Sequence, residues 1–170
     1  RSDDALAECA VSEGVPVYRG DLDNVLERAL GAIQDFKLTQ AARVCGDRAF
    51  LDYGSIDLAF KALDAGADLA SNISNRPAPG LTTEAFSALA LSRARSLVKS
   101  KDETEHITQV FYRNPNSFKI TPIPCPPMPA GRELAVDTKE HWQRVDAAYR
   151  TLEAQHGPDY HARASWEEIA

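Results

Sequence analysis

The sequence has few of the residues that build disulfide frameworks, structural metal sites or membrane spans. Its three cysteines, Cys9, Cys45 and Cys125, are far apart and form no CxxC pair, which favours reduced thiols over a disulfide scaffold. The four histidines show no metal-ligand spacing. No apolar run approaches the roughly 20 residues that a membrane span needs. We therefore expect a cytoplasmic protein with no part in the membrane.

Positive charge is also scarce. The chain has 19 lysines and arginines against 25 acidic residues, which gives a net charge of −6. Non-specific binding of DNA or RNA needs a basic face, so the composition argues against a nucleic-acid partner. This argument does not extend to a nucleotide, because a metal ion and a few basic side chains neutralise its phosphates locally. The chain opens with Arg1 and shows no signal peptide, so we expect that its natural start is missing.

Length and composition fit one soluble globular domain. The 170 residues are 44% hydrophobic and 26% charged, and they are numerous enough to bury a substantial core. We expect this domain over residues 1–156 and a polar C-terminal tail over 157–170. Five prolines between Pro122 and Pro129 indicate an extended connector that makes few hydrogen bonds.

Short apolar segments alternate with helical stripes along the chain. Strands are expected at 15–18, 43–45, 68–71, 118–123 and 134–136. Helices are expected at 3–12, 22–36 with Asp21 as its cap, 55–65, 86–98, 102–112, and after Thr138, which would cap the last one. Such alternation is typical of an α/β fold with a largely parallel sheet. The polar loop 72–80 is placed to cover a site.

Two aspartates directly follow predicted strands. Asp47 ends the Arg43–Gly46 segment, and Asp137 ends the Leu134–Val136 segment. Open parallel sheets bind ligands outside the carboxyl ends of their strands, so neighbouring strands would point both carboxylates into one crevice. Paired carboxylates suit Mg²⁺, which completes its shell with water and phosphate oxygens. Both residues also suit a turn or a helix N-cap, and their spacing alone favours that simpler interpretation.

Five sequence blocks occur in a fixed order. They are GVPVYRG with NVLER at 14–20 and 24–28, RVCGD at 43–47, GLTTEAFS at 80–87, EHIT at 105–108 and LAVDT at 134–138. Their order resembles that of the cytidylyltransferases of the spore-coat polysaccharide biosynthesis type. That family is related to the acylneuraminate and 3-deoxy-manno-octulosonate cytidylyltransferases. The resemblance covers nearly the whole chain.

This resemblance implies a Rossmann-like nucleotidyltransferase sheet, mostly parallel, with helices on both faces. It also implies a homodimer that transfers CMP from CTP to a sugar hydroxyl, with Mg²⁺ as cofactor, for the synthesis of a surface polysaccharide or glycan. Asp47 and Asp137 would be the catalytic Mg²⁺ ligands that organise the triphosphate.

The resemblance assigns five further residues to substrate binding. Arg19 and Arg28 would contact anionic groups of the substrates. Glu84 would lie on the sugar side of the site. Glu105 and His106 would line the pocket or brace the sugar loop.

The sequence also departs from the family pattern. The family's domain begins with a strand and a basic, glycine-rich loop around the CTP phosphates, and this sequence contains no such loop. The domain over 1–156 is therefore expected to be N-terminally incomplete. Arg48, Thr104 and Ala135 replace the residues usual at their positions. These departures support an alternative, a non-catalytic or truncated relative that acts in sugar-nucleotide or partner binding.

Overall fold

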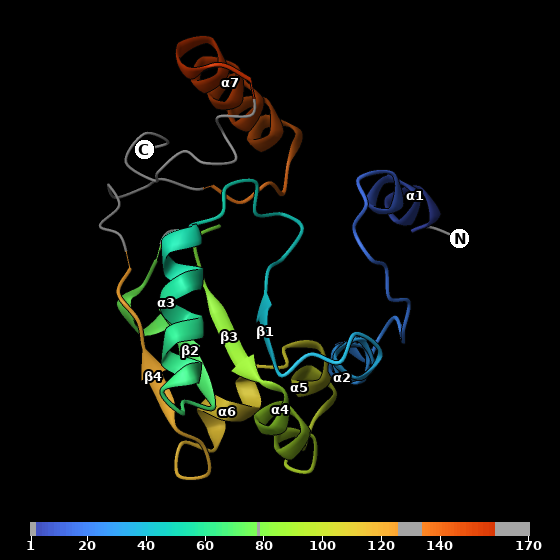
Figure 1. Ribbon diagram of the computed structural model, residues 1–170, viewed down its shortest axis with the longest axis vertical. Coiled ribbons are helices and arrows are strands. Elements are labelled where there is room, and N and C mark those ends of the chain that lie inside the picture. Colours follow the sequence, from blue (N-terminus) through green and yellow to red (C-terminus); the bar gives the residue numbers. More distant parts are fainter. Residues whose placement is uncertain (1–2, 78, 126–133, 159–170) are drawn as a thin grey trace.

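The computed structural model describes residues 3–77, 79–125 and 134–158, which form a mixed sheet with helices packed on it (Figure 1). The strands are β1 (Gln40–Arg43), β2 (Leu69–Ser71), β3 (Glu84–Ser87) and β4 (Ile120–Pro122). The helices are α1 (Asp4–Ser12), α2 (Val25–Asp35), α3 (Tyr53–Asp64), α4 (Ala88–Arg95), α5 (Lys101–Glu105), α6 (Gln109–Arg113) and α7 (Lys139–His156), with a short 3₁₀ helix η1 (Ile73–Asn75) after β2.

The strands lie in the order β1-β3-β2-β4. β3 is antiparallel to both of its neighbours, whereas β2 and β4 are parallel. It follows that β1, β2 and β4 run in one direction and that β3 alone runs against them. The predicted α/β fold is confirmed, but the sheet is mixed: β3 runs against its neighbours, so two of the three described pairings are antiparallel and only that of β2 with β4 is parallel.

The two central strands present their side chains alternately to two apolar layers. Leu69 and Phe86 are paired across β2 and β3, and both pack into the cluster that Phe111 shares with α2 and α4. Their neighbours Ala70 and Ala85 pack on the other side, against residues of α3. Because successive residues of a strand point to opposite faces, this alternation requires a helical layer on each face. The predicted helices on both faces are thus confirmed, and Figure 1 shows α3 lying across the sheet.

Two helix caps were predicted from short polar residues, and one prediction was wrong. Thr138 caps α7 as expected, since its hydroxyl accepts the His141 N–H at 3.2 Å. Asp21 does not cap α2. Its carboxylate instead accepts the N–H groups of Asp23 and Asn24, both at 2.8 Å, and so stabilises a turn. The cap is Asn24, whose side chain accepts the Glu27 N–H at 3.0 Å, so α2 begins later than expected.

The strand expected at 15–18 is absent, and that prediction was wrong. The segment is extended, but none of the described strands pairs with it. The Tyr18 ring packs on α2 instead, so close to Gly31 that a Cβ there would lie 2.0 Å from the Tyr18 hydroxyl. The strand expected at 43–45 lies at Gln40–Arg43, because Ala41 and Ala42 are the residues that pair with β3.

Two helix predictions were wrong in their extent. The stripe at 86–98 was expected to be helical from its start, but residues 84–87 form β3, and Ser87 then caps α4 by accepting the Ala90 N–H at 3.1 Å. A short apolar run in a sequence is compatible with a buried strand or with a helix. Residues 84–87 form a strand because they lie between β1 and β2 in the sheet. The helix expected over 102–112 is divided at His106 into α5 and α6.

Parts of the predicted connector and tail lie outside the described residues, namely 126–133 and 159–170. The division of the chain at residue 156 therefore stays a prediction. Among the helices of the described ranges, none combines the length and the apolar character that crossing a membrane requires.

Replacing Phe111 by alanine should destabilise the fold strongly. The Phe111 side chain is fully buried, and its ring centroid lies 4.6 Å from that of Phe118 and 6.5 Å from that of Phe86. Deleting such a ring typically lowers the free energy of unfolding by about 3–5 kcal/mol, because the core loses the transfer free energy of the ring and the packing contacts around it. Urea unfolding followed by circular dichroism measures the loss. The matched control is Phe36→Ala, which removes the same atoms from a ring that is 36% exposed. An equal loss in both variants would contradict this account of the core.

Candidate active site

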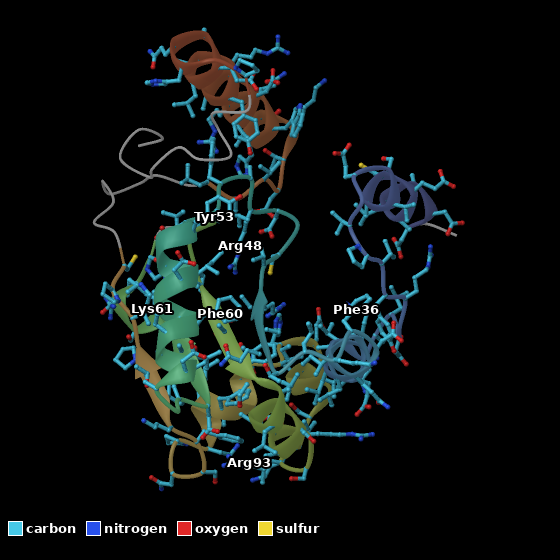
Figure 2. The ribbon with its side chains drawn as sticks, in the orientation of Figure 1. Phe36, Arg48, Tyr53, Phe60, Lys61 and Arg93 are labelled. Carbon is cyan, nitrogen blue, oxygen red and sulfur yellow. The ribbon has the colours of Figure 1, made fainter. Side chains whose placement is uncertain are left out.

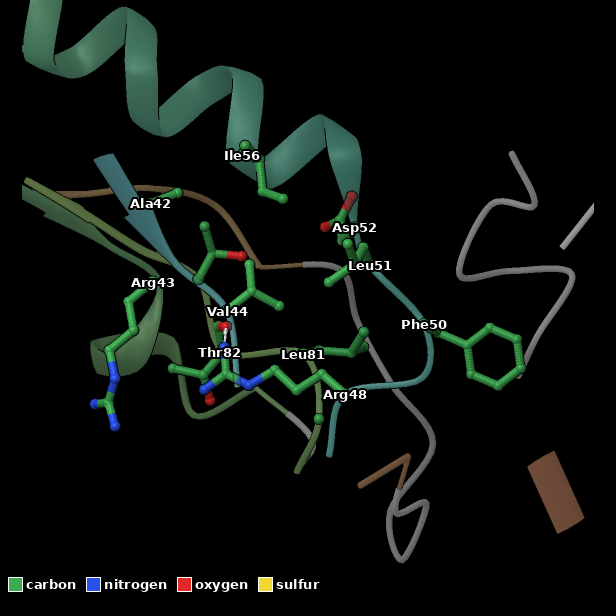
Figure 3. Close-up of a pocket in the computed structure, with 12 residues that line it drawn as sticks. Ala42, Arg43, Val44, Arg48, Phe50, Leu51, Asp52, Ile56, Leu81 and Thr82 are labelled. Atoms are coloured by element: carbon green, nitrogen blue, oxygen red, sulfur yellow. Dashed lines mark hydrogen bonds between the residues drawn. The ribbon is translucent and has the colours of Figure 1, made fainter. Parts of the chain in front are cut away.

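The strands β1, β2 and β4 end at the same edge of the sheet, where α3 begins (Figure 1). A crevice at this edge encloses about 10 Å³, which is room for a single water molecule. Its lining comes from the end of β1, the segment leading into α3 and the segment before β3 (Figure 3): Ala42, Arg43, Val44, Arg48, Phe50, Leu51, Asp52, Ile56, Gly80, Leu81, Thr82 and Thr83. Polar side chains and backbone groups therefore meet where an open α/β sheet binds its ligands.

The segments that carry Asp47 and Asp137 are neighbours, but not in the way expected. The prediction of a strand at 134–136 in the parallel sheet was wrong. These residues form only a single bridge, in which Ala135 lies antiparallel to Arg48. The Val136 N–H donates to the Asp47 carbonyl at 2.8 Å, and Asp137 follows directly. Two short segments after β1 and before α7 thus bring the backbones of both aspartates to the same place.

The side chains of Asp47 and Asp137 are accessible. Asp47 is half-buried and Asp137 is exposed. Within residues 3–77, 79–125 and 134–158, neither carboxylate makes a hydrogen bond or an ion pair. Four carboxylate oxygens are therefore available to a hard cation such as Mg²⁺. The same ranges contain no preformed group of three or more His, Cys, Asp or Glu side chains that could hold a metal ion.

Gly80 lets the segment before α7 approach the sheet. The Leu134 N–H donates to the Pro79 carbonyl at 2.9 Å, beside Gly80. Gly80 has a φ of +95°, and a Cβ on it would lie 2.7 Å from the Leu134 carbonyl carbon and 2.8 Å from the Ala135 nitrogen. Only glycine fits both the backbone conformation and the space. The position of Asp137 therefore depends on Gly80.

Asn72, which the sequence analysis did not single out, holds the segment between β2 and β3. Its side chain is fully buried, its amide donates to the Leu81 carbonyl at 2.9 Å, and its Oδ1 accepts the Thr83 N–H at 2.9 Å. The backbone N–H of Asn72 also donates to the Thr83 carbonyl, at 3.2 Å. A carboxamide residue directly after the predicted strand that ends at Ser71 was the available signal. Asn72 fixes the wall of the crevice that Thr82 and Thr83 form.

Two arginines line the crevice. Arg43 is the last residue of β1 and lies opposite Glu84 in the sheet register. Arg48 lies beyond the carboxyl end of β1 (Figure 2), and its guanidinium donates to the Thr82 carbonyl. This contact joins the turn after β1 to the segment before β3. Arg48 therefore closes one side of the crevice.

Glu84 is buried behind this edge, with 6% of its surface exposed. Its Oε2 accepts the Thr108 hydroxyl at 3.1 Å and its Oε1 accepts the Tyr112 hydroxyl at 2.8 Å. Burial, and then the negative charge of Glu84, raise the pKa of the Tyr112 hydroxyl well above its ordinary value, so that this donor stays protonated. In this structure Glu84 ties β3 to α6, and it is not among the described residues that line the crevice.

Glu105 and His106 lie at the end of α5, and both are exposed. The His106 Nε2 lies 3.8 Å from a carboxylate oxygen of Asp102, one helical turn earlier. Neither residue is among those described as lining the crevice. The structure therefore does not bring them together with Asp47.

Arg19 and Arg28 line a separate hollow of about 810 Å³ beside α1. Arg19 forms an ion pair with Asp4 of α1, with an N···O distance of 2.9 Å. Arg28 donates to the backbone carbonyls of Asp21 and Leu22. In this structure these contacts hold the segment between α1 and α2, and they lie apart from the crevice.

The sequence matches no family model. It is 32% identical over 142 residues to an uncharacterized protein, MJ1063, of Methanocaldococcus jannaschii, a match that covers 81% of this chain and 57% of that protein. It is 29% identical over 154 residues to the spore coat polysaccharide biosynthesis protein SpsF of Bacillus subtilis, covering 88% of this chain and 63% of that one.

A solved cytidylyltransferase from Leptospira borgpetersenii has the same fold. Its TM-score is 0.81 at 25% sequence identity, over 88% of this chain and 64% of the solved one. The chain is similar in sequence to SpsF and in sequence and fold to this cytidylyltransferase. The resemblance seen in the five blocks is thereby confirmed, as is the Rossmann-like nucleotidyltransferase fold. The chain spans less than two thirds of the length of each of the three proteins.

Replacing Gly80 by alanine should displace the segment that carries Asp137. A positive φ costs an alanine about 1–2 kcal/mol, and the contact with Leu134 and Ala135 adds a clash with backbone atoms. We expect a lower melting temperature and faster hydrogen exchange of the Val136 amide, which bonds to Asp47.

The matched control for this variant is Gly14→Ala. Gly14 has a φ of +72°, but nothing lies within 4 Å of its Cβ position. This control should therefore show only the backbone cost and leave the Val136 amide unaffected. If both variants exchange that amide at the same rate, Gly80 does not position the segment.

Proposed function

We propose that this chain is part of a nucleotidyltransferase that transfers CMP from CTP to a sugar hydroxyl with Mg²⁺ as cofactor. The observation that carries the proposal is the pairing of residues 47–48 with 135–136, which sets two unpaired carboxylates at the ligand-binding edge of a cytidylyltransferase-like sheet. The name of the Bacillus subtilis relative supports a role in the synthesis of a surface polysaccharide.

In this reaction the sugar oxygen attacks the α-phosphorus of CTP, and the bond from that phosphorus to the β-bridging oxygen breaks. The hydroxyl proton passes to solvent or to a base, and pyrophosphate leaves. Catalysis of such a transfer rests on in-line positioning and on neutralising the phosphate charge. Asp47 and Asp137 are the residues that would hold Mg²⁺, whose contribution is to neutralise that charge. Their free oxygens suit this role.

The sugar side of the site is assigned to the loop 72–80, which follows β2 at the same edge. Residues 73–76 of this loop are exposed, and Asn72 anchors its start. The substrate-binding roles of Glu105, His106, Arg19 and Arg28 stay predictions, because none of these residues lines the crevice in the part of the chain that the structure describes. Homodimer formation and a cytoplasmic location complete the proposal.

The size of the crevice favours a second candidate function. A drug-sized ligand needs a pocket of about 300–1,000 Å³, and the crevice encloses only about 10 Å³. A non-catalytic relative that keeps the fold for binding a protein partner would need no nucleotide-sized pocket at this edge.

Replacing Asp47 or Asp137 by asparagine should abolish the proposed activity without unfolding the protein. The assay measures pyrophosphate release from CTP with Mg²⁺ and a panel of neutral, amino and acidic sugars. It uses the longest natural form of the chain. Because asparagine keeps the shape but loses the charge, kcat should fall at least about 100-fold, or about 2.7 kcal/mol.

The control for these variants is Asp57→Asn, which removes an exposed carboxylate from α3, outside the crevice lining. Its kcat should stay within about twofold of the wild type. If the longest natural form neither binds CTP nor releases pyrophosphate, the catalytic function fails and the binding function replaces it.

A further inference from the structure

Arg43 and Arg48 differ from the ion-paired arginines of this acidic chain. Both are half-buried, and neither has a carboxylate partner within the described ranges. Five other arginines do have one: Arg19 with Asp4, Arg93 with Asp68, Arg95 with Glu27, Arg113 with Glu103 and Arg150 with Asp146. Two half-buried cations in one crevice without a counter-ion are costly unless an anion joins them.

Two acidic side chains near the arginines, Glu84 and Asp52, are already engaged, and Asp47, which precedes Arg48, forms no ion pair with it within the described residues. Glu84 lies opposite Arg43 in the register, but each of its oxygens accepts a hydroxyl group, from Thr108 just before α6 and from Tyr112 within it. Asp52 also lines the crevice, and its carboxylate accepts the N–H and the hydroxyl of Ser55 at the start of α3. The charge of the two arginines is therefore not balanced by an ion pair with either acid.

The guanidinium groups keep most of their donors free. A guanidinium has five N–H donors, and Arg48 uses one for the Thr82 carbonyl. Arg43 makes no hydrogen bond through its side chain within the described residues. Figure 3 shows both side chains extending to the same side of the crevice, Arg43 from the end of β1 and Arg48 from the turn after it.

We propose that Arg43 and Arg48 form a subsite for an oxyanion of a substrate. This inference rests on the proposed function, whose reaction involves phosphate groups in every case and a carboxylate when the acceptor is a sugar acid. The planar guanidinium fork matches both kinds of oxyanion in a bidentate manner. The small crevice admits the oxygens of such a group at its mouth, and Arg48 exchanges the Thr82 carbonyl for one of them.

The test is a titration of the chain with inorganic pyrophosphate, without CTP and without metal, followed by NMR chemical shifts and calorimetry. A second arm uses glucuronate as a sugar acid. Arg43→Gln and Arg48→Gln should each raise the dissociation constant of the bound anion at least tenfold. Arg43→Lys, which keeps the charge but loses the fork, should weaken binding less than Arg43→Gln. Binding of glucuronate alone would identify the anion as the acceptor's carboxylate.

The matched control is Arg95→Gln on α4, the helix that also carries Arg93, toward the opposite end of the sheet (Figure 2). It removes the same charge from a side chain that is 61% exposed and should change the dissociation constant less than twofold. Circular dichroism shows which variants are folded. If Arg43→Gln does not fold, Arg48→Gln and Arg43→Lys decide the question.

Several results would overturn the subsite. One is a dissociation constant that is the same for wild type, Arg43→Gln and Arg48→Gln. Another is tighter binding of the anion by Arg48→Gln, which would mean that the Arg48 side chain blocks the crevice instead of binding the anion. The subsite would also be overturned if the wild type bound neither pyrophosphate nor glucuronate. Because neither CTP nor metal is present, failure of CMP transfer in the earlier assay does not decide this result, and the two proposals can fail independently.

Discussion

The backbone pairing of β3 with β1 and β2 is the constraint on which the rest of the structure depends. β3 is the only described strand that joins β1 to the pair of β2 and β4, so without it the two parts of the sheet would share no hydrogen bonds. The same four residues serve both faces, with Phe86 in one apolar layer and Ala85 in the other. At the start of β3, Glu84 is tied to α6 by two hydroxyl groups.

The candidate site is built from segments that this sheet holds in place. Residues 47–48 leave β1, residues 134–136 precede α7, and one backbone hydrogen bond between Val136 and Asp47 joins them. Gly80, in the segment before β3, leaves the space in which they meet. The site thus contains no long strand of its own. Its geometry rests on a few backbone contacts, which is usual for ligand-binding loops on a rigid scaffold.

Charged side chains of both signs lie at the edge of the sheet where β1 ends. The chain is acidic overall, yet two half-buried arginines line the crevice. The segments that carry Asp47 and Asp137 meet beside it, and neither carboxylate has a partner among the described residues. Positive groups for oxyanions and carboxylates for a hard cation are the two elements that phosphate chemistry requires. The proposed CMP transfer and the proposed oxyanion subsite both follow from this arrangement, although they use different residues and can be separated by experiment.

The sequence by itself determined the fold class, the relation to the cytidylyltransferases and most helices, because helical stripes, caps such as Thr138 and the order of short motifs are local properties. It did not reveal β3, the later start of α2 or the single bridge at Ala135. These depend on which segments meet. Residues 84–87 form a strand because they pair with β1 on one side and β2 on the other. Residues 15–18 form no strand because none of the described strands pairs with them. Likewise, the sequence identified Asp47 and Asp137, but only the tertiary structure brought their backbones together and placed Arg19, Arg28, Glu105 and His106 apart from them. It also left Arg43 and Arg48 without a carboxylate partner among the described residues.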